Sequence, residues 1–495
     1  MYPYSHILST NDFPDGASIH DMVVAGQKMV PYALARSAPT GFPTKKGTLL
    51  FLEPSTRTLG SFMQAMLNLM MRTHQISGAE GTSLVKKESF ADTARMLADQ
   101  GADVLVLRSG LEGGARWMAE VLEDYGREVT VLNGGDGRNQ HPTQTMLDLL
   151  TILIKKGRLD NLHIGLVGDL ANGRTAVSLI QALRHFENIR VTLVAPKGAE
   201  MLSQYKAGIN VVCESESMEA LKECDVIYVT RFQLERIADV ALRLAVQGTY
   251  VFNKKFLDIC KPDVIVMHPL PSVEEIDPDI KNDPRMVAFE QARYGIPTRM
   301  ALIARALLNP FVGIGRPRHD ADLLINAESI RIEDRGKPVK HFQPITTGTV
   351  IDHLPPNRAI AALHLLEQLT SIGDNHPRQL VQLVRSRKYE GLKDVMLLSG
   401  ITLPDVAAAT LQFIFPEITI NEFPGNETQL KKRFHIPSHV FGVFRCLNSS
   451  CITNADPEAA TIFRVLDRST PGSVCRCHYC ERDFPHDQLV ARLCA

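Results

Sequence analysis

The sequence predicts an α/β protein with parallel sheets, followed by a smaller α/β segment and a cysteine-rich tail. From residue 45 to 310, short apolar runs alternate with longer amphipathic stretches, which is typical of parallel strands joined by helices. After residue 313 the chain becomes rich in charge, glycine and proline, and a shorter α/β pattern begins at residue 345. Six of the nine cysteines lie after residue 445, in a region too small to form a core without a metal.

The expected strands of the first part are short runs of apolar residues. They are 48–52, 104–107, 129–132, 163–167, 191–195, 226–229 and 264–267. A helix is expected over about 56–72, because Pro54 breaks the first strand and Ser55 is a good N-cap. A second helix, over 143–155, is expected at the junction between two subdomains.

Composition limits the class of protein. A chain of 495 residues is too long for one ordinary core, so about two to four domains are expected. The net charge of -1 gives no electrostatic argument for a nucleic-acid or acidic membrane partner. No apolar stretch approaches the roughly 20 residues of a membrane span, and the N-terminus lacks a secretory pattern. We therefore expect a cytoplasmic protein with free thiols.

The strongest local motif lies at the start of the helix that follows the first strand. Its cap and first turn contain Ser55, Thr56, Arg57 and Thr58. Free backbone N–H groups and the positive pole of the helix dipole favour anions there, and hydroxyl and guanidinium groups suit phosphate. The motif predicts chemistry on a small phosphorylated substrate, without the glycine-rich loop of a P-loop nucleotide site.

Further polar residues follow an expected strand directly or after a short loop. They are Arg108, His141, Asp169, Arg174, Thr230, Arg231 and His268. Ligands of open parallel sheets bind outside the carboxyl ends of the strands, so these residues are candidates for one site. Taken singly, Ser55 would more often be only a helix cap and His141 a structural histidine.

The tail contains two pairs of cysteines with chelating spacing. Four residues separate Cys446 from Cys451, and two separate Cys477 from Cys480. Four thiolates form a closed tetrahedral site, which is the structural type for zinc. Cys475 is an alternative to Cys477, because Cys475 and Cys480 would also chelate.

The first 310 residues resemble the catalytic chain of aspartate carbamoyltransferases over nearly their whole length. The matching blocks are EPSTRT (53–58), TSLVKK (82–87), NQHPTQ (139–144), GDLANGRT (168–175), TRFQLER (230–236) and HPLP (268–271). Ornithine carbamoyltransferases share the patterns at 55–58 and 141–144, but usually have cysteine at the position of Pro269. The resemblance implies the carbamoyltransferase fold, with two doubly wound parallel-sheet subdomains.

The resemblance implies transfer of a carbamoyl group from carbamoyl phosphate to L-aspartate, the committed step of pyrimidine biosynthesis, with no catalytic cofactor. The residues implied for carbamoyl phosphate are Ser55, Thr56, Arg57, Thr58, Ser83, Arg108, His141, Gln144, Leu270 and Pro271. Those implied for aspartate are Lys87, Arg174, Arg231 and Gln233. The catalytic candidates are Arg57, Thr58, Lys87, Arg108 and His141.

The loop that contains Ser83 and Lys87 reaches into the active site of a neighbouring subunit in this family. We therefore expect a homotrimer with shared active sites, able to form a larger homo-oligomer.

The part after residue 345 resembles the regulatory chain of the same enzyme, which binds nucleotide effectors and zinc. The implied effector residues are Asp352, His353, Asn421 and Lys431. Leu397 stands where a phosphate-binding lysine is expected, and Asn426 where a tyrosine is expected, so we expect a weak or absent response to ATP and CTP. The register of the tail favours Cys446, Cys451, Cys477 and Cys480 as ligands of one structural Zn²⁺ per chain.

The expected organisation has five parts. They are a carbamoyl-phosphate subdomain (1–140, with a returning helix at 291–310), an aspartate subdomain (141–290), a linker (311–344), a regulatory nucleotide-effector-like domain (345–434) and a zinc-binding β-rich domain (435–495). Two alternatives are a carbamoyltransferase for another amine acceptor and an inactive assembly scaffold.

Overall fold

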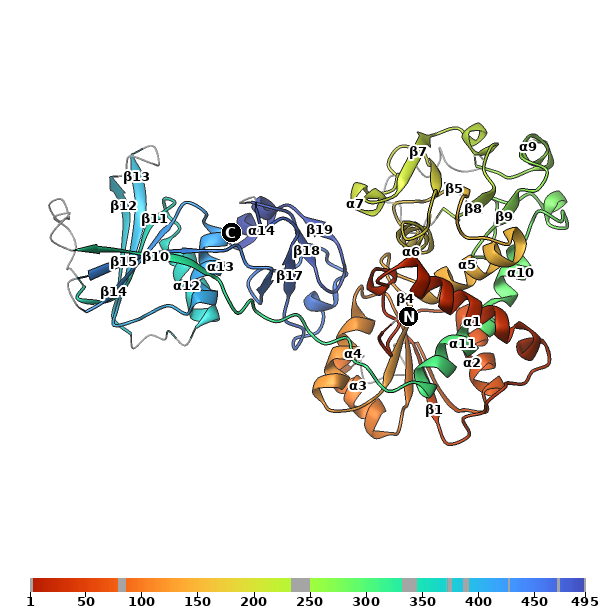
Figure 1. The fold of residues 1–495 in the computed structure, drawn as a ribbon, viewed down its shortest axis with the longest axis horizontal. Helices are drawn as coiled ribbons and strands as arrows, with labels where there is room; N and C mark the ends of the chain where they lie inside the picture. Colours follow the sequence, from red (N-terminus) through yellow and green to blue (C-terminus); the bar gives the residue numbers. More distant parts are fainter. Residues whose placement is uncertain are drawn as a thin grey trace. The chain divides into compact units, whose positions relative to one another are not determined.

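The computed structural model describes residues 3–78, 86–232, 250–331, 345–370, 372, 376–385, 391–425, 428–469 and 472–493. The chain forms two compact units, residues 1–315 with 450–458 and residues 316–449 with 459–495. Figure 1 shows the elements of both units, coloured along the sequence. In the described part of the chain, no helix has both the length and the apolar character needed to cross a bilayer.

The first sheet of the larger unit consists of four parallel strands in the order β2-β1-β3-β4. Their bounds are β1 Lys46–Phe51, β2 Arg72–Ser77, β3 Val104–Ser109 and β4 Thr130–Asp136. The helices that follow the first three strands or cover the sheet are α1 Gly16–Leu34, α2 Thr56–Asn68, α3 Phe90–Asp99, α4 Gly114–Asp124 and α11 Gly295–Leu308. In Figure 1, α3 and α4 cover one face, and α1, α2 and α11 cover the other. Because both faces are covered, β1, β3 and β4 are almost wholly buried, and β1 and β3 contain apolar runs.

The second sheet consists of five parallel strands in the order β7-β6-β5-β8-β9. Their bounds are β5 His163–Val167, β6 Arg190–Val194, β7 Asn210–Ser215, β8 Val226–Val229 and β9 Ile265–Met267. The helices of this part are α6 Arg174–Leu183, α7 Ser203–Lys206, α9 Lys254–Ile259 and α10 Ala288–Arg293. The short 3₁₀ turns of the unit are η1 Thr10–Asp12, η4 Met218–Leu221 and η6 Pro278–Ile280.

Helix α5 (Pro142–Lys156) joins the two sheets, and α1 and α11 pack against it. Pro142 suits the first turn of a helix, and Gly157 ends the helix in the left-handed region, at φ +70°. Apolar residues from both sheets belong to one core cluster, which includes Leu49, Ile164 and Tyr228. This continuous core holds the carboxyl ends of the two sheets in fixed positions.

The predicted fold class is confirmed. The runs 163–167 and 226–229 form β5 and β8 with the expected bounds, and α2 begins at Thr56. The sequence did not indicate β2 and β7, whose residues are RTHQIS and NVVCES. Both strands lie at the edge of a sheet and are partly exposed, so they lack the apolar run of a central strand.

The smaller unit contains a six-stranded antiparallel sheet in the order β10-β15-β14-β11-β13-β12. Its strands are β10 Leu324–Arg331, β11 Thr347–Leu354, β12 Arg378–Arg385, β13 Leu392–Ser399, β14 Thr419–Pro424 and β15 Thr428–Phe434, with helices α12 Ala359–Leu369 and α13 Asp405–Ile414. Strand β10 lies inside the segment 311–344 that we expected to be a linker. Its pairing with β15, about a hundred residues later in the chain, is a non-local contact that the local composition does not indicate.

The C-terminal part forms a four-stranded antiparallel sheet in the order β16-β17-β18-β19. Its elements are β16 His439–Phe441, η8 Ile452–Asn454, β17 Ile462–Val465, β18 Cys475–Cys477, β19 Asp483–Phe484 and α14 His486–Leu493. Residues 450–458 belong to the larger unit, where the N–H of Glu112 donates to the carbonyl of Ser450 at 2.8 Å and Arg95 pairs with Glu458 at 2.7 Å.

Candidate active site

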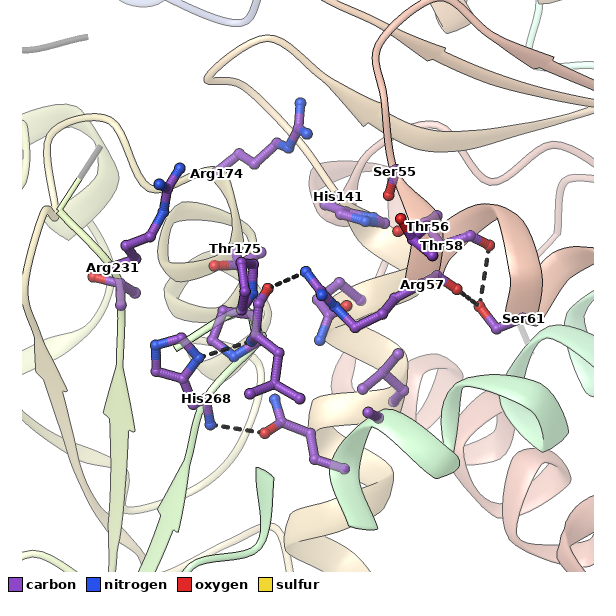
Figure 2. Close-up of a pocket in the computed structure, with 18 of the residues that line it drawn as sticks. Ser55, Thr56, Arg57, Thr58, Ser61, His141, Arg174, Thr175, Arg231 and His268 are labelled. Carbon is purple, nitrogen blue, oxygen red and sulfur yellow. Dashed lines mark hydrogen bonds between the residues drawn. The ribbon is translucent and has the colours of Figure 1, made fainter. Parts of the chain in front are cut away.

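A cavity of about 440 Å³ lies in the larger unit, beside the carboxyl ends of strands from both sheets (Figure 2). The residues that line it are Pro54, Ser55, Thr56, Arg57, Thr58, Ser61, Arg108, His141, Gln144, Leu147, Gly173, Arg174, Thr175, Thr230, Arg231, His268, Pro269, Leu270, Pro271, Gln291, Ala292 and Arg299. They come from the end of β3, from the segments that follow β1, β4, β5, β8 and β9, and from α5, α10 and α11. The cavity therefore lies where parallel sheets bind ligands.

The start of α2 forms one wall of the cavity. Ser55 is the N-cap residue, with extended backbone, and its side chain makes no capping hydrogen bond. The Ser61 hydroxyl donates to the carbonyl of Arg57 at 2.6 Å, one turn along the helix (Figure 2). The first-turn N–H groups and the hydroxyls of Ser55, Thr56 and Thr58 therefore lie beside the cavity, as an anion site requires.

Two arginines of the cavity are held by backbone carbonyls at the end of β4 and just after it. Arg108 Nη1 donates to the carbonyl of Gly134 at 3.0 Å, and Arg174 Nη1 donates to the carbonyl of Gly137 at 2.9 Å. The carboxylate of Glu53 lies 3.3 Å from Arg174 Nη1 and 3.9 Å from Arg108 Nε. Glu53 therefore offsets part of the repulsion between these two guanidinium groups.

Arg57 connects the first half of the site with the loop after β9. Its Nη2 donates to the carbonyl of Leu270 at 2.6 Å, and burial lowers the pKa of its guanidinium group. The peptide bond between Leu270 and Pro271 is cis. The loop is held from behind by His268, whose Nδ1 accepts from the N–H of Leu270 at 2.8 Å and whose Nε2 lies 2.8 Å from Glu275 Oε1. His268 thus supports the loop.

His141 is the N-cap residue of α5 and is buried. Its backbone N–H donates to Ser178 Oγ at 2.8 Å. Burial, and then the positive charges of Arg108, Arg174 and Arg299, lower the pKa of His141 well below its usual value. The imidazole is therefore neutral near pH 7 and presents one N–H donor and one acceptor.

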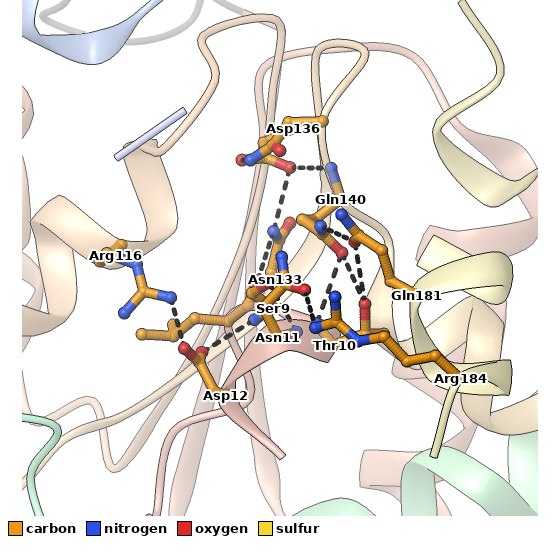
Figure 3. A network of polar contacts seen from close by, with 12 residues as sticks. Ser9, Thr10, Asn11, Asp12, Arg116, Asn133, Asp136, Gln140, Gln181 and Arg184 are labelled. Atoms are coloured by element: carbon orange, nitrogen blue, oxygen red, sulfur yellow. Dashed lines mark hydrogen bonds and ion pairs between the residues drawn. The ribbon is translucent and has the colours of Figure 1, made fainter. Parts of the chain in front are cut away.

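A buried network holds the loop that precedes His141 (Figure 3). The carboxylate of Asp136 accepts from the backbone N–H groups of Gly113 and Gln140, both at 2.8 Å, and from the side chains of Asn133 and Asn139. Burial raises the pKa of Asp136 to about 7. The Gln140 side chain accepts from the Ser178 hydroxyl at 2.9 Å, which connects this loop to α6. The network fixes His141 between the two sheets.

Most of the site residues predicted from the sequence line the cavity. They are Ser55, Thr56, Arg57, Thr58, Arg108, His141, Gln144, Arg174, Arg231, Leu270 and Pro271. Lys87 does not line it; this residue is exposed and has a left-handed backbone, at φ +67°. Ser83 and Gln233 lie outside the described residues.

Sequence reasoning missed several residues of the cavity. Thr175, Gln291 and Arg299 line it, and none was predicted to belong to the site. Arg299 is 2% exposed on the largely apolar helix α11, and burial lowers its pKa to about 9. The available signal was a charged residue in the middle of a largely apolar helix, because buried charges mark functional or paired positions.

A second cluster in the C-terminal part consists of four buried cysteines, Cys446, Cys451, Cys477 and Cys480. Their sulfur atoms all lie within 4.8 Å of one another, and those of Cys446 and Cys480 are 3.7 Å apart. A tetrahedral zinc site with Zn–S bonds of about 2.3 Å needs sulfur atoms about 3.8 Å apart. Cys475 lies outside the cluster, and burial raises the pKa of its thiol to about 12. The geometry therefore fits one metal ion and selects Cys477 over Cys475.

Models of known families match four successive parts of the chain. The carbamoyl-P binding domain of aspartate/ornithine carbamoyltransferases matches residues 5–153, and the Asp/Orn binding domain matches residues 160–306. The allosteric domain and the metal binding domain of the aspartate carbamoyltransferase regulatory chain match residues 340–435 and 438–490.

The relatives of the first part are consistent with these models. The aspartate carbamoyltransferase catalytic subunit of Methanospirillum hungatei is 39% identical over 312 residues, which cover 61% of this chain and 100% of that subunit. The subunit of Thermofilum pendens is 46% identical over 264 residues, which cover 52% of this chain and 81% of that subunit. The solved catalytic subunit of M. jannaschii aspartate transcarbamoylase is 37% identical, with a TM-score of 0.55. The match covers 61% of this chain and 98% of that subunit.

The chain belongs to the aspartate carbamoyltransferase family. It is a carbamoyltransferase that contains the catalytic domains and both regulatory domains of this family in one chain. The chain is also similar to the aspartate transcarbamoylase from Trypanosoma cruzi, which was solved in complex with N-(phosphonacetyl)-L-aspartic acid. The identity is 32% and the TM-score 0.55, and the match covers 60% of this chain and 94% of that enzyme.

In this carbamoyltransferase, the expected effector residues lie on neighbouring strands of the regulatory sheet. Asn421 of β14 is in register with Val350 of β11 on one side and with Lys431 of β15 on the other. Asp352 accepts from Lys393 Nζ at 2.6 Å. Leu397 is in register with Val350 and is buried, so an apolar side chain occupies the position expected for a phosphate-binding lysine.

The pKa of His141 leads to a prediction about carbamoyl transfer. We predict that His141 donates to the oxyanion that develops during attack, so His141→Ala should lower kcat by about 100- to 1000-fold. His141→Asn keeps a donor that does not titrate. Because the pKa of His141 is held well below its usual value, wild type and His141→Asn should have parallel profiles of log kcat between about pH 6 and 8. A fall of wild-type kcat near pH 6.5 that His141→Asn abolishes would contradict the neutral imidazole.

Proposed function

We propose that the protein transfers the carbamoyl group of carbamoyl phosphate to the amine of L-aspartate, forming N-carbamoyl-L-aspartate and phosphate. The observation that carries this proposal is one cavity that combines the hydroxyl-rich start of α2, His141 and arginines from both sheets. These groups suit a phosphate dianion beside a dicarboxylate.

The start of α2 is proposed to hold the phosphate of carbamoyl phosphate. Ser55, Thr56 and Thr58 supply hydroxyl and backbone donors, and Arg57 and Arg108 supply charge-assisted donors. Thr58, Arg108 and His141 donate to the carbonyl oxygen, where negative charge grows during attack. The neutral state of His141 supports this role, because it can donate without adding a positive charge that must be solvated.

The other end of the site is proposed to hold aspartate. Arg174 and Arg231 line the cavity from the half formed by the second sheet, and each binds one carboxylate of the substrate. The amine then attacks the carbonyl carbon, a C–N bond forms and the C–O bond to phosphate breaks. The amine loses a proton and the departing phosphate gains one, so no covalent intermediate is required. The effect is orientation combined with electrostatic stabilisation.

A different amine acceptor is the main alternative. The regions that bind substrate share their family models with ornithine carbamoyltransferases. Five arginines, and no carboxylate, among the described residues that line the cavity favour an acidic acceptor over a cationic one. An inactive scaffold is disfavoured, because Arg57, His141 and Arg174 all line one cavity.

The function is tested by assays with carbamoyl phosphate and either L-aspartate or L-ornithine. Turnover is expected with aspartate only, and Arg174→Ala should raise the KM for aspartate at least about tenfold, because a charge-assisted hydrogen bond contributes about 1.5–3 kcal/mol. Arg190→Ala, at an exposed position of β6, is the matched control and should leave KM unchanged. Turnover with ornithine, or an unchanged KM in Arg174→Ala, would contradict the assignment.

The nucleotide response is proposed to be weak. Buried Leu397 in place of a lysine, and the engagement of Asp352 by Lys393, support this view. In the aspartate assay, CTP at subsaturating aspartate is expected to leave the rate unchanged. Clear inhibition at submillimolar CTP would contradict it.

A homotrimer with shared active sites is also proposed, with further association left open. A second cavity of about 500 Å³ adjoins the site, shares Pro54, Ser55 and Thr56 with it, and has Gly78 in its lining. Lys87 lies beyond that glycine and does not line the site of its own chain. Both facts support a site that is completed in the assembly. Lys87 and Ser83 would come from another copy of the chain, and Gln233 from the same copy. The cytoplasmic location and the place in pyrimidine biosynthesis stay predictions.

The cysteine cluster is proposed to bind one structural Zn²⁺ per chain. Cys480→Ser should lose the metal, as measured by atomic emission, while carbamoyl transfer persists, because none of the four cysteines lines the active-site cavity. Cys475→Ser, also buried but outside the cluster, should retain one zinc. For the proposed trimer, the solution mass of the wild-type protein should be a multiple of three chains of 54.9 kDa. Zinc loss in Cys475→Ser, or wild type without zinc, would contradict the site.

A further inference from the structure

A buried carboxylate lies behind the wall of the active site and is not among the substrate-binding residues named above. Asp148 is on α5, four residues after Gln144, and is fully buried. Its Oδ1 accepts from Gln144 Nε2 at 2.9 Å and from Gln291 Nε2 at 2.6 Å, and its Oδ2 accepts from the hydroxyl of Tyr228 at 2.9 Å. Asp148 does not line the cavity, whereas Gln144 and Gln291 do.

The contact with Asp148 determines which end of the Gln144 amide is available to a ligand. An ionised carboxylate accepts hydrogen bonds and cannot donate them. The amide nitrogen of Gln144 must therefore point at Asp148, and only its oxygen remains for the cavity. An oxygen at that position accepts a hydrogen bond from an N–H group and repels a carbonyl.

The same carboxylate controls a second acceptor through Gln291. The Oε1 atom of Gln291 accepts from the backbone N–H of His268 at 2.8 Å, a group that can only donate, so its Nε2 must face Asp148. His268 Nδ1 in turn accepts from the N–H of Leu270 at 2.8 Å, as the dashed lines at His268 in Figure 2 show. This chain of hydrogen bonds sets the position of the Leu270 backbone, whose carbonyl faces Arg57.

We propose that Asp148 is a positioning residue that makes the site select a carbamoyl group over an acyl group without N–H. It does so by holding the Gln144 oxygen and the Leu270 carbonyl as two acceptors for the carbamoyl NH₂. Acetyl phosphate has a methyl group in place of that NH₂, so it leaves the Gln144 oxygen without a donor and gives the Leu270 carbonyl none beyond Arg57. An unpaired acceptor of this kind is how a polar site rejects an analogue. This inference rests on the proposed function, since it concerns the substrate of the same site.

The surroundings of Asp148 are consistent with an acceptor role. The groups that face it are Gln144 on its own helix, Gln291 on α10, Tyr228 on β8 and the positive charge of Arg299 on α11. Burial raises the pKa of Asp148 to about 7, so assays well above that value keep it ionised.

The experiment compares carbamoyl phosphate with acetyl phosphate in wild type and in Asp148→Asn, at about pH 8.5 with saturating aspartate. The readouts are the KM for carbamoyl phosphate and the inhibition constant of acetyl phosphate against it. An amide at position 148 can donate a hydrogen bond to the two glutamines. The side-chain amide of Gln144 can then rotate so that its nitrogen, and not its oxygen, faces the cavity. The KM for carbamoyl phosphate should rise at least about tenfold, because roughly one to two hydrogen bonds to the carbamoyl group are lost. The inhibition constant of acetyl phosphate should change less than about threefold, because acetyl phosphate makes neither bond.

Two further variants keep the test decisive. Thr151→Val, a buried substitution on the same helix whose hydroxyl bonds only within α5, should change neither constant. Gln291→Met removes the Gln291 bonds to Asp148 and His268 but leaves the Gln144–Asp148 bond in place. It should give an intermediate rise in KM, and it tests the proposal if Asp148→Asn does not fold. Parallel changes in both constants would overturn the proposal, because they indicate a structural role alone. Wild type without turnover of aspartate would overturn the proposed function as well.

Discussion

The structure depends on concentrating positive charge in one cavity. Among the described residues that line it there are five arginines and no carboxylate, namely Arg57, Arg108, Arg174, Arg231 and Arg299. Two like charges 4 Å apart repel by about 4 kcal/mol at an effective dielectric constant of 20, so such a site is stable only if the fold supplies compensating groups. Backbone carbonyls and Glu53 hold the arginines at its rim, and Asp148 lies behind Arg299. A phosphate dianion and a dicarboxylate supply the remaining negative charge.

This concentration of charge also determines the properties of its neighbours. His141 stays neutral because it is buried beside three of the arginines, so it can donate a hydrogen bond without acting as an acid. Burial lowers the pKa of Arg57 and Arg299 as well. The continuous core around α5 and the network of Asp136 keep these groups at fixed distances, which is how preorganised donors stabilise a transition state.

The sequence predicted the parts of the site that local pattern encodes. The strand, proline and N-cap before Thr56 predict the helix start, and the residues after each apolar run predict which side chains meet at the sheet edge. Gln291, Arg299 and Asp148 were not predicted, because they lie on helices and reach the site only through packing. Strands β2 and β7 were missed because edge strands are short of apolar residues, and β10 because its partner is distant in the chain.

The most direct test of the charged cavity is calorimetric binding of N-(phosphonacetyl)-L-aspartate, which joins a phosphonate and a dicarboxylate in one molecule. Wild type should bind one molecule per chain. Arg57→Ala and Arg174→Ala should each weaken binding at least about tenfold, because each loses a charge-assisted contact to a different end of the ligand. Binding that is absent in wild type, or unchanged in both variants, would contradict the account.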